Sequence, residues 1–141
     1  MMKQLVLSLL AALISLPASA DAYFFYTYEG QTLTYVTSGD NCHVFNVNMH
    51  ETTSPNVIIP EAVYSKENQR SYTVTEIQNS AFSLSTGITS VTIPATVQTI
   101  KNNAFYNCSL SSVSLPKAKT IRSHAFYNCT NLKTITFNGP I

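Results

Sequence analysis

The chain has 141 residues, enough for one domain and not comfortably two. Eight Lys and Arg residues nearly balance seven Asp and Glu residues, and the formal net charge is +1, so any electrostatic preference must come from local clustering. Three cysteines make an odd count, which does not fit a disulfide-stapled framework.

The first 20 residues have the pattern of a secretory signal peptide. Lys3 gives a positive start, residues 5–16 are almost all apolar, and Ala18 and Ala20 supply small residues where a signal peptidase cuts. The apolar run is shorter than the ~20 residues that span a bilayer. We therefore expect cleavage before Asp21 and a secreted, periplasmic or cell-surface protein without membrane insertion. An uncleaved anchor is the alternative.

Residues 21–56 are predicted to form an N-terminal antiparallel β cap. Residues 23–28 and 31–36 are rich in aromatic and β-branched side chains, and Glu29 and Gly30 separate them at hairpin length. A second turn precedes a third expected strand at residues 42–47. Such a meander would cover strand edges and apolar core at the open end of a repeat array that follows.

Two phrases then recur in step from residue 57 to residue 141. The phrase Ile-x-x-x-Ala-Phe occurs at residues 77–82, 100–105 and 121–126, so its Ala-Phe pairs lie 23 and 21 residues apart. A short strand-like phrase accompanies it at residues 57–60, 91–94, 113–116 and 135–137. Self-similarity at roughly 20–29 residues is typical of a leucine-rich-repeat solenoid, in which each copy is one coil. Residues 57–141 thus predict a β-rich repeat solenoid of about three coils.

Alternation along each strand predicts which side chains form the core of this solenoid. Like residues of successive coils should stack inside it in four columns: Val91, Val113 and Ile135; Ile93, Leu115 and Phe137; Ile77, Ile100 and Ile121; Phe82, Phe105 and Phe126. The first coil carries an insertion, predicted to be a projecting hairpin over residues 63–74. The last coil has no polar cap, so we expect either an open edge that a partner or a second copy covers, or a chain truncated at its C-terminus.

The segment at residues 88–108 closely resembles the BspA-like leucine-rich repeat, with Ile-Pro, Ile-x-x-x-Ala-Phe and Asn-Cys in register. This family occurs in surface and secreted proteins of bacteroidetes, spirochaetes and some protozoan parasites. The resemblance covers residues 57–141 and implies a curved β-rich solenoid. It also implies, for some members, adhesion to host matrix proteins or other microbes, and it implies no catalytic residues.

Two cysteines occupy the same place in successive coils. Cys108 and Cys129 each follow a repeat alanine by four residues, and Ser85 holds that place in the earlier coil. Equivalent positions stack at ~4.8 Å, so two buried reduced thiols and a Cys108–Cys129 bridge are both open interpretations. Zinc is not expected, because the sequence has no CxxC pair or His-x-x-x-His, and no cofactor is predicted.

The candidate ligand-binding residues lie on outward strand positions and among the basic residues of the repeats. All acidic residues lie at or before Glu76, whereas five basic residues follow Ile77. Outward hydroxyl groups form two ladders, Ser90/Ser112/Thr134 and Thr92/Ser114/Thr136. Both features have a plain alternative, which is solvation of an exposed strand and of an ordinary lysine face. The candidates are Lys101, Lys117, Lys119, Arg122, Lys133, Thr92, Ser114 and Thr136.

The sequence therefore predicts an exported, non-enzymatic interaction module that binds a protein or glycan ligand at the cell envelope or outside the cell. The basic residues favour an acidic ligand by long-range attraction, and nucleic acid is not expected among its partners. The second hypothesis is a structural solenoid that associates with itself through its open C-terminal coil, or part of a longer array. A glycan-processing enzyme is the third, but His43 and His124 share no triad-like spacing with Ser, Cys or Asp.

Overall fold

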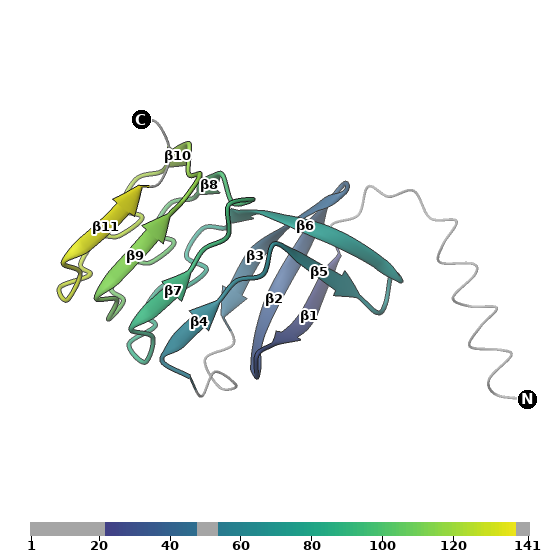
Figure 1. Cartoon of the computed structure of the whole chain (residues 1–141), viewed down its shortest axis with the longest axis horizontal. Coiled ribbons are helices and arrows are strands. Elements are labelled where there is room, and N and C mark those ends of the chain that lie inside the picture. The colour runs from purple at the N-terminus through teal and green to yellow at the C-terminus, as the bar shows by residue number, and fades with distance from the viewer. Residues whose placement is uncertain (1–21, 48–53, 138–141) are drawn as a thin grey trace, which may run out of the picture.

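The computed structural model describes residues 22–47 and 54–137 (Figure 1). The predicted signal peptide, residues 1–20, lies outside these ranges, as do residues 138–141 at the predicted open end. The described residues form strands and turns without a helix. In chain order the strands are β1 (Tyr23–Tyr28), β2 (Gln31–Ser38), β3 (Asn41–Val47), β4 (Asn56–Ile58), β5 (Ala62–Ser65), β6 (Arg70–Ile77), β7 (Ser90–Thr92), β8 (Thr99–Ile100), β9 (Ser112–Leu115), β10 (Thr120–Ile121) and β11 (Thr134–Phe137).

The first three strands form an antiparallel meander, close to the predicted ranges. Tyr28 pairs with Gln31 across a two-residue turn whose residues, Glu29 and Gly30, have φ values of 52° and 73°. Turns of this left-handed kind match the right-handed twist of the strands they join. One face of the meander is apolar and packs inward through Phe24, Tyr35 and other buried side chains.

The predicted hairpin is present, but it does not simply project from the first coil. β5 and β6 are antiparallel, with Val63 opposite Tyr72. β6 also pairs in parallel with β3 and, near its end, with β8. Val63, Tyr72 and Val74 are buried. The insertion therefore joins the meander to the coils within one seven-stranded sheet, in the order β1-β2-β3-β6-β8-β10 with β5 beside β6.

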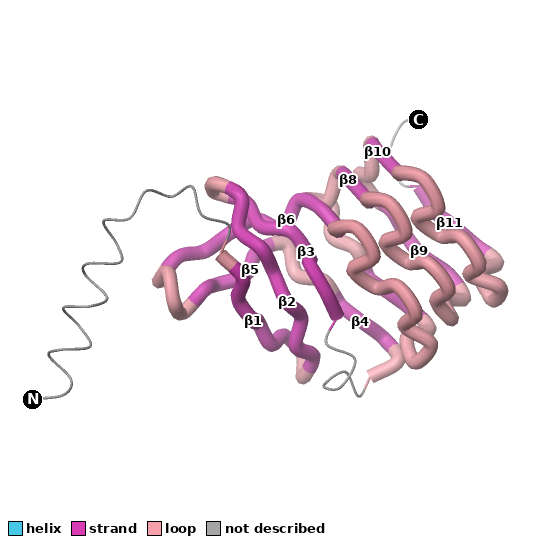
Figure 2. The backbone as a smooth tube through the Cα atoms, turned by 180° about the vertical axis from the view of Figure 1, so that it is seen from behind, coloured by secondary structure: helices cyan, strands magenta, loops and turns pink. Residues whose placement is uncertain are grey.

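The repeats build a second, four-stranded sheet in the order β11-β9-β7-β4, with its strands parallel (Figure 1). Its register follows the repeat, because Val57, Val91, Val113 and Ile135 are paired in sequence from strand to strand. One coil thus consists of a strand of this sheet, a short segment, a strand of the seven-stranded sheet and a turn back. The backbone passes through these coils one after another, with their turns side by side (Figure 2).

Each turn contains two residues in the left-handed region. Ser80, Asn103 and His124 have φ values of 58°, 57° and 58°, and four residues further on Leu84, Asn107 and Asn128 have values of 64°, 55° and 57°. Asn tolerates this conformation better than most residues with a side chain. The repeated Ala-Phe pair lies between the two positions.

Backbone hydrogen bonds join each turn to the next. In the first turn the N–H groups of Ser80, Phe82 and Leu84 donate to the carbonyls of Asn102, Ala104 and Tyr106, at 3.0, 2.7 and 2.8 Å. The second turn repeats the pattern one coil further on. There the N–H groups of Asn103, Phe105 and Asn107 donate to the carbonyls of Ser123, Ala125 and Tyr127, at 3.2, 2.8 and 2.9 Å. The turns are therefore hydrogen-bonded ladders like the sheets.

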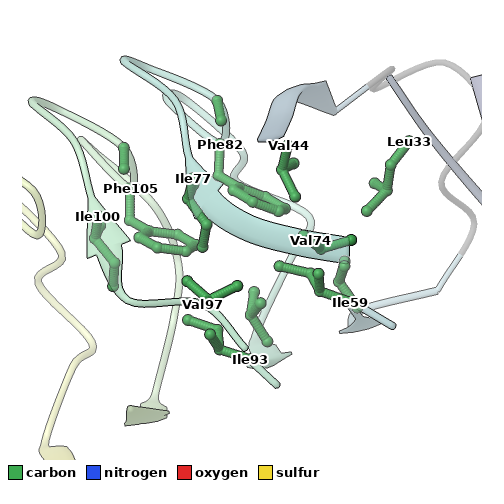
Figure 3. Packing of buried hydrophobic residues seen from close by; sticks show 14 of the residues in the cluster. Leu33, Val44, Ile59, Val74, Ile77, Phe82, Ile93, Val97, Ile100 and Phe105 are labelled. Carbon is green, nitrogen blue, oxygen red and sulfur yellow. The ribbon is translucent and has the colours of Figure 1, made fainter. Parts of the chain in front are cut away.

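A column of phenylalanine rings fills the coils, as the repeat predicts. The ring centroids of Phe82 and Phe105 are 4.8 Å apart and those of Phe105 and Phe126 are 5.2 Å apart, with interplanar angles of 14° and 2°. Figure 3 shows Phe82 and Phe105 beside Ile77 and Ile100, with Val44 of the meander completing the same core. Stacking of rings and aliphatic side chains makes each coil depend on its neighbours.

The predicted core was wrong at the last described coil. Ile121, Ile135 and Phe137 are 40%, 38% and 49% exposed. Their counterparts one coil earlier, Ile100, Val113 and Leu115, are 0%, 3% and 1% exposed. The pairing partners are as predicted, but among the described residues no further coil covers the C-terminal side of this one. A stacked column buries a side chain only where there is a neighbour on both sides.

Candidate ligand-binding surface

The outer face of the four-stranded sheet carries the two predicted ladders in register. Ser90 pairs with Ser112 and Thr92 with Ser114, and β11 extends both ladders through Thr134 and Thr136. Thr92, Ser112, Thr134 and Thr136 are exposed, and Ser114 is half-buried. Strands in a sheet are ~4.8 Å apart, so this face presents hydroxyl groups at regular spacing.

Sequence reasoning missed the first row of this face. β4 places Asn56 beside Ser90 and Ile58 beside Thr92. Ser90 Oγ lies 2.7 Å from Asn56 Oδ1, and the Ile58 side chain is 36% exposed. The strand-like phrase at residues 57–60 pointed to this strand, but the alternation was not followed back to its outward positions.

The basic candidates do not form one cluster. Lys117 and Lys119 lie between β9 and β10, and Arg122 directly follows β10. Lys133 directly precedes β11, and its N–H donates to the Ser111 carbonyl at 3.0 Å. Lys117 follows the end of β9 and Lys133 precedes the start of β11, so the two lie at opposite ends of parallel strands. All four of these residues are exposed.

Lys101 differs from the other basic candidates because it has an acidic partner. Its Nζ is 2.6 Å from Glu76 Oε1 and donates to Gln78 Oε1 at 3.1 Å. Gln78 Nε2 in turn lies 3.0 Å from Glu76 Oε1 and 2.8 Å from His43 Nδ1. The charge of Lys101 is therefore largely used within a half-buried network that ties β3, β6 and β8 together. The unopposed charge expected there is instead carried by Lys117, Lys119, Arg122 and Lys133.

The three cysteines are free thiols. Cys108 Sγ donates to the Phe82 carbonyl at 2.8 Å and Cys129 Sγ to the Phe105 carbonyl at 2.9 Å, each in the preceding turn. Burial raises the pKa of Cys42 and of Cys108 to about 12, and burial also raises the pKa of Cys129. Because a nucleophilic or metal-binding cysteine needs the thiolate, these environments suit packing rather than chemistry.

Gln31 is a further residue that the sequence did not single out. Its side chain is buried, with 4% of the residue exposed. Its Nε2 donates to the Asn56 carbonyl, and its Oε1 accepts the Ile58 N–H at 3.1 Å. The carboxamide thus occupies the place of a peptide group in a neighbouring strand. It satisfies one outward carbonyl and one outward N–H of β4, the last strand at that end of the four-stranded sheet.

The two histidines of the enzyme hypothesis have polar neighbours: His43 Nδ1 lies 3.4 Å from Glu76 Oε1, and His124 Nδ1 lies 2.6 Å from Ser123 Oγ. Residues 22–47 and 54–137 contain no cluster of three or more His, Cys, Asp or Glu side chains that could hold a metal ion. His124 is exposed and its ring contacts Tyr127. The same residues contain no helix that is long and apolar enough to cross a membrane.

Comparison with known proteins supports the fold described above. The model of the BspA type leucine rich repeat region matches residues 64–141, which is more than half of the chain. A leucine-rich repeat protein from Eubacterium ventriosum aligns with a TM-score of 0.60 and 25% identity, over 80% of this chain and 27% of that one. The pneumococcal vaccine antigen PcpA aligns with a TM-score of 0.50 and 20% identity, over 84% of this chain and 39% of PcpA, a likeness in fold.

The chain therefore spans well under half the length of either solved structure. A search of curated proteins finds no match. The residues that the family model matches include the recurring Ala-Phe turns and the parallel strands β7, β9 and β11. The chain belongs to the BspA-type leucine-rich repeat family and has its strand-rich fold.

Proposed function

We propose that this chain is an exported, non-enzymatic interaction module, similar in role to an adhesin, that binds an acidic protein or acidic glycan at the cell surface or outside the cell. The proposal rests chiefly on one observation. Among the described residues after Glu76, Lys117, Lys119, Arg122 and Lys133 are exposed and basic, and no acidic residue offsets them.

The architecture supports a binding role. In this interpretation the meander of β1, β2 and β3 is an N-terminal cap, and about three coils follow it. The coils present the ladders of hydroxyl groups as a flat, rigid surface whose side chains need little ordering on binding. Membership of a leucine-rich-repeat family adds weight, because solenoids offer extended surfaces for partners.

The expected mode of binding is electrostatic recognition completed by hydrogen bonds. Exposed basic side chains attract an acidic ligand over about 8 Å at physiological salt, and binding should weaken as salt is raised. Hydroxyl groups such as those of Thr92, Ser114 and Thr136 can then donate to carboxylate, sulfate or carbonyl oxygens of the ligand. The signal-peptide pattern at residues 1–20 and the family membership support an extracytoplasmic location.

The proposal is tested with two acidic probes, poly-L-glutamate and heparin, on residues 21–141, the mature chain expected after signal-peptide cleavage. We expect the double variant Lys119→Glu/Arg122→Glu to bind either probe about tenfold more weakly than the unmodified chain, because two attractive charges become repulsive. The matched comparison is between Arg122→Glu alone and Lys66→Glu, which reverses one exposed charge in the β5–β6 turn, away from the coils.

The results separate the possible ligands as well. Binding to poly-L-glutamate alone favours an acidic protein, and binding to heparin alone favours a sulfated glycan. If Lys66→Glu reduces the affinity as much as Arg122→Glu alone, binding reflects total charge only, and the proposal is refuted. So would the absence of binding to both probes at low salt.

A further inference from the structure

The C-terminal side of the last described coil is an exposed apolar surface. We define this C-terminal face by Ile121, Phe126, Tyr127, Ile135 and Phe137. Four of its side chains are 38–57% exposed, and the Phe126 ring is partly buried. The coil before it buries four of these positions, at Ile100, Phe105, Val113 and Leu115, and half-buries the fifth, at Tyr106. The face therefore matches a surface that another coil covers earlier in the chain.

The turn of this coil directs backbone donors to the same side. In the earlier turns, three N–H groups donate to carbonyls of the following coil at 2.7–3.2 Å. By the same periodicity, the donors of the last turn are the N–H groups of His124, Phe126 and Asn128. We expect each of them to donate to a carbonyl oxygen of a further segment, as the corresponding N–H groups of the turn before donate to the carbonyls of this turn.

The side-chain columns point to the same occupant. The Asn128 amide donates to Asn107 Oδ1 at 2.7 Å, and the Tyr106 and Tyr127 rings stack with centroids 5.7 Å apart. Each column can be extended by one more residue of the same kind. A segment with the geometry of a repeat coil would therefore satisfy the apolar columns and the backbone donors together.

The two ends of the four-stranded sheet are not equivalent. At β4 the Gln31 carboxamide already bonds the outward backbone groups of Asn56 and Ile58. β11, at the other end, has β9 as its one neighbour in the sheet among the described residues. The β4 end of a second copy therefore offers fewer free backbone groups for pairing with β11. The C-terminal face of a second copy would bring Arg122 and Lys133 of both copies together, which is electrostatically unfavourable.

We propose that the C-terminal face binds an acidic polypeptide segment that folds onto it as one further repeat coil. Carboxylates in that segment would lie beside Arg122 and Lys133, as Glu76 lies beside Lys101 of the next coil at 2.6 Å. The idea rests on the proposed preference for acidic partners, but it uses a different surface from the hydroxyl ladders. It names the partner as protein rather than glycan.

The test uses a synthetic coil peptide as the probe. The peptide spans residues 112–133 with Lys117→Glu, Lys119→Glu, Arg122→Glu and Lys133→Glu, and Cys129→Ser prevents disulfide formation. Control peptides are the same segment with its native basic residues and a scrambled acidic version, each also with Cys129→Ser. Fluorescence anisotropy should show that the acidic coil peptide binds the mature chain at least about tenfold more tightly than either control.

A variant of the face should remove this binding without unfolding the protein. Ile135→Asn replaces an exposed apolar side chain. We expect it to weaken binding of the acidic coil peptide about tenfold and to leave binding of poly-L-glutamate unchanged. Tyr127→Ala is a second variant in the turn, and thermal melts followed by circular dichroism check folding of both. If the unmodified chain binds the acidic coil peptide but neither poly-L-glutamate nor heparin, the proposed function alone is refuted.

Three results would overturn the inference. Equal affinity for the scrambled acidic peptide would mean that charge acts without docking of a coil. Sedimentation showing a dimer that Ile135→Asn dissociates would mean that a second copy occupies the face. Tighter peptide binding after deletion of residues 138–141 would mean that those residues cover it. A monomer whose peptide binding is unaffected by that deletion supports the proposal.

Discussion

At the scale of single residues, backbone conformation explains a difference between otherwise matching turns. Asn107 and Asn128 occupy the second left-handed position of their turns, whereas the first turn has Leu84 there, with φ of 64° and a side chain that is 58% exposed. Leucine gains little from packing at this site and bears the steric cost of the left-handed region.

Leu84→Asn should therefore stabilise the protein. We expect the free energy of unfolding to rise by about 0.5–1 kcal/mol, because Asn reaches this conformation at lower cost. Urea denaturation monitored by circular dichroism measures the change. The reverse substitution Asn107→Leu should lower stability by at least a similar amount, and a destabilised Leu84→Asn variant would contradict this explanation.

The buried thiols make stability depend on alkaline pH. Burial holds the pKa of Cys42 and Cys108 at about 12 in the folded chain, above the ~8.5 of an unfolded thiol. Below pH ~8.5 both states keep the proton, and above it only the unfolded state releases it. Between pH ~8.5 and the folded pKa, the free energy of unfolding therefore falls by about 1.4 kcal/mol per pH unit for each thiol.

Urea midpoints at pH 7.5 and pH 9.5 test this dependence. The unmodified chain should become markedly less stable at the higher pH. The variant Cys42→Ala/Cys108→Ser should show a smaller loss between the two values, whatever its stability at pH 7.5. Ser is chosen at position 108 because Ser85 occupies the equivalent place in the preceding turn and is buried. Equal losses in the two proteins would mean that the thiols are not responsible.

At the scale of secondary-structure elements, Gln31 ends the four-stranded sheet at β4. Replacing it with the similarly sized Leu removes the partner of the Ile58 N–H and one of two donors to the Asn56 carbonyl, which also accepts from Ser54 Oγ at 3.1 Å. We expect Gln31→Leu to cost about 1–3 kcal/mol of stability, because two part-buried hydrogen bonds worth about 0.5–1.5 kcal/mol each are lost. The matched control is Gln98→Leu at an exposed position, expected to change stability by about 0.5 kcal/mol or less. Thermal or urea unfolding compares the two.

Strands that show alternation or the repeat could be predicted from the sequence. The pairing of strands that lie far apart in the sequence could not. The meander strands and the parallel register of Val91, Val113 and Ile135 follow from alternation and from the repeat. The pairing of β3 with β6 was missed, because nothing local to residues 63–74 indicates which distant strand they will join. Gln31 was missed for the same reason, since it contacts β4 from 25 residues away.

The candidate surface was predictable to the same extent. Periodicity placed Ser114 beside Thr92 and Thr136, as the register confirms. It could not show that Lys101 is paired with Glu76, because the two residues come together only when successive coils stack. Nor could it show that Lys117 and Lys133 lie at opposite ends of the strands. Ligand binding by these residues remains a prediction.

At the scale of the whole molecule, the stacking of the coils gives the uneven distribution of charge along the sequence a direction in space. The acidic residues lie in the first 76 positions, and the coils that follow expose basic side chains and hydroxyl groups. Because each coil is held by the next through ladders and ring columns, the distribution of charge along the sequence becomes a distribution along the solenoid. An acidic partner should therefore meet the coils rather than the meander.

The most direct measurement is a titration of the ¹⁵N-labelled mature chain with poly-L-glutamate, followed by amide chemical shifts. The account predicts that shifts concentrate in the coils, at Ser114, Lys119, Arg122 and Thr136, and diminish in the Lys119→Glu/Arg122→Glu variant. Amides of β1, β2 and β3 should stay in place. Shifts concentrated in these three strands, or spread evenly along the chain, would contradict the claim that the basic coils form the binding surface.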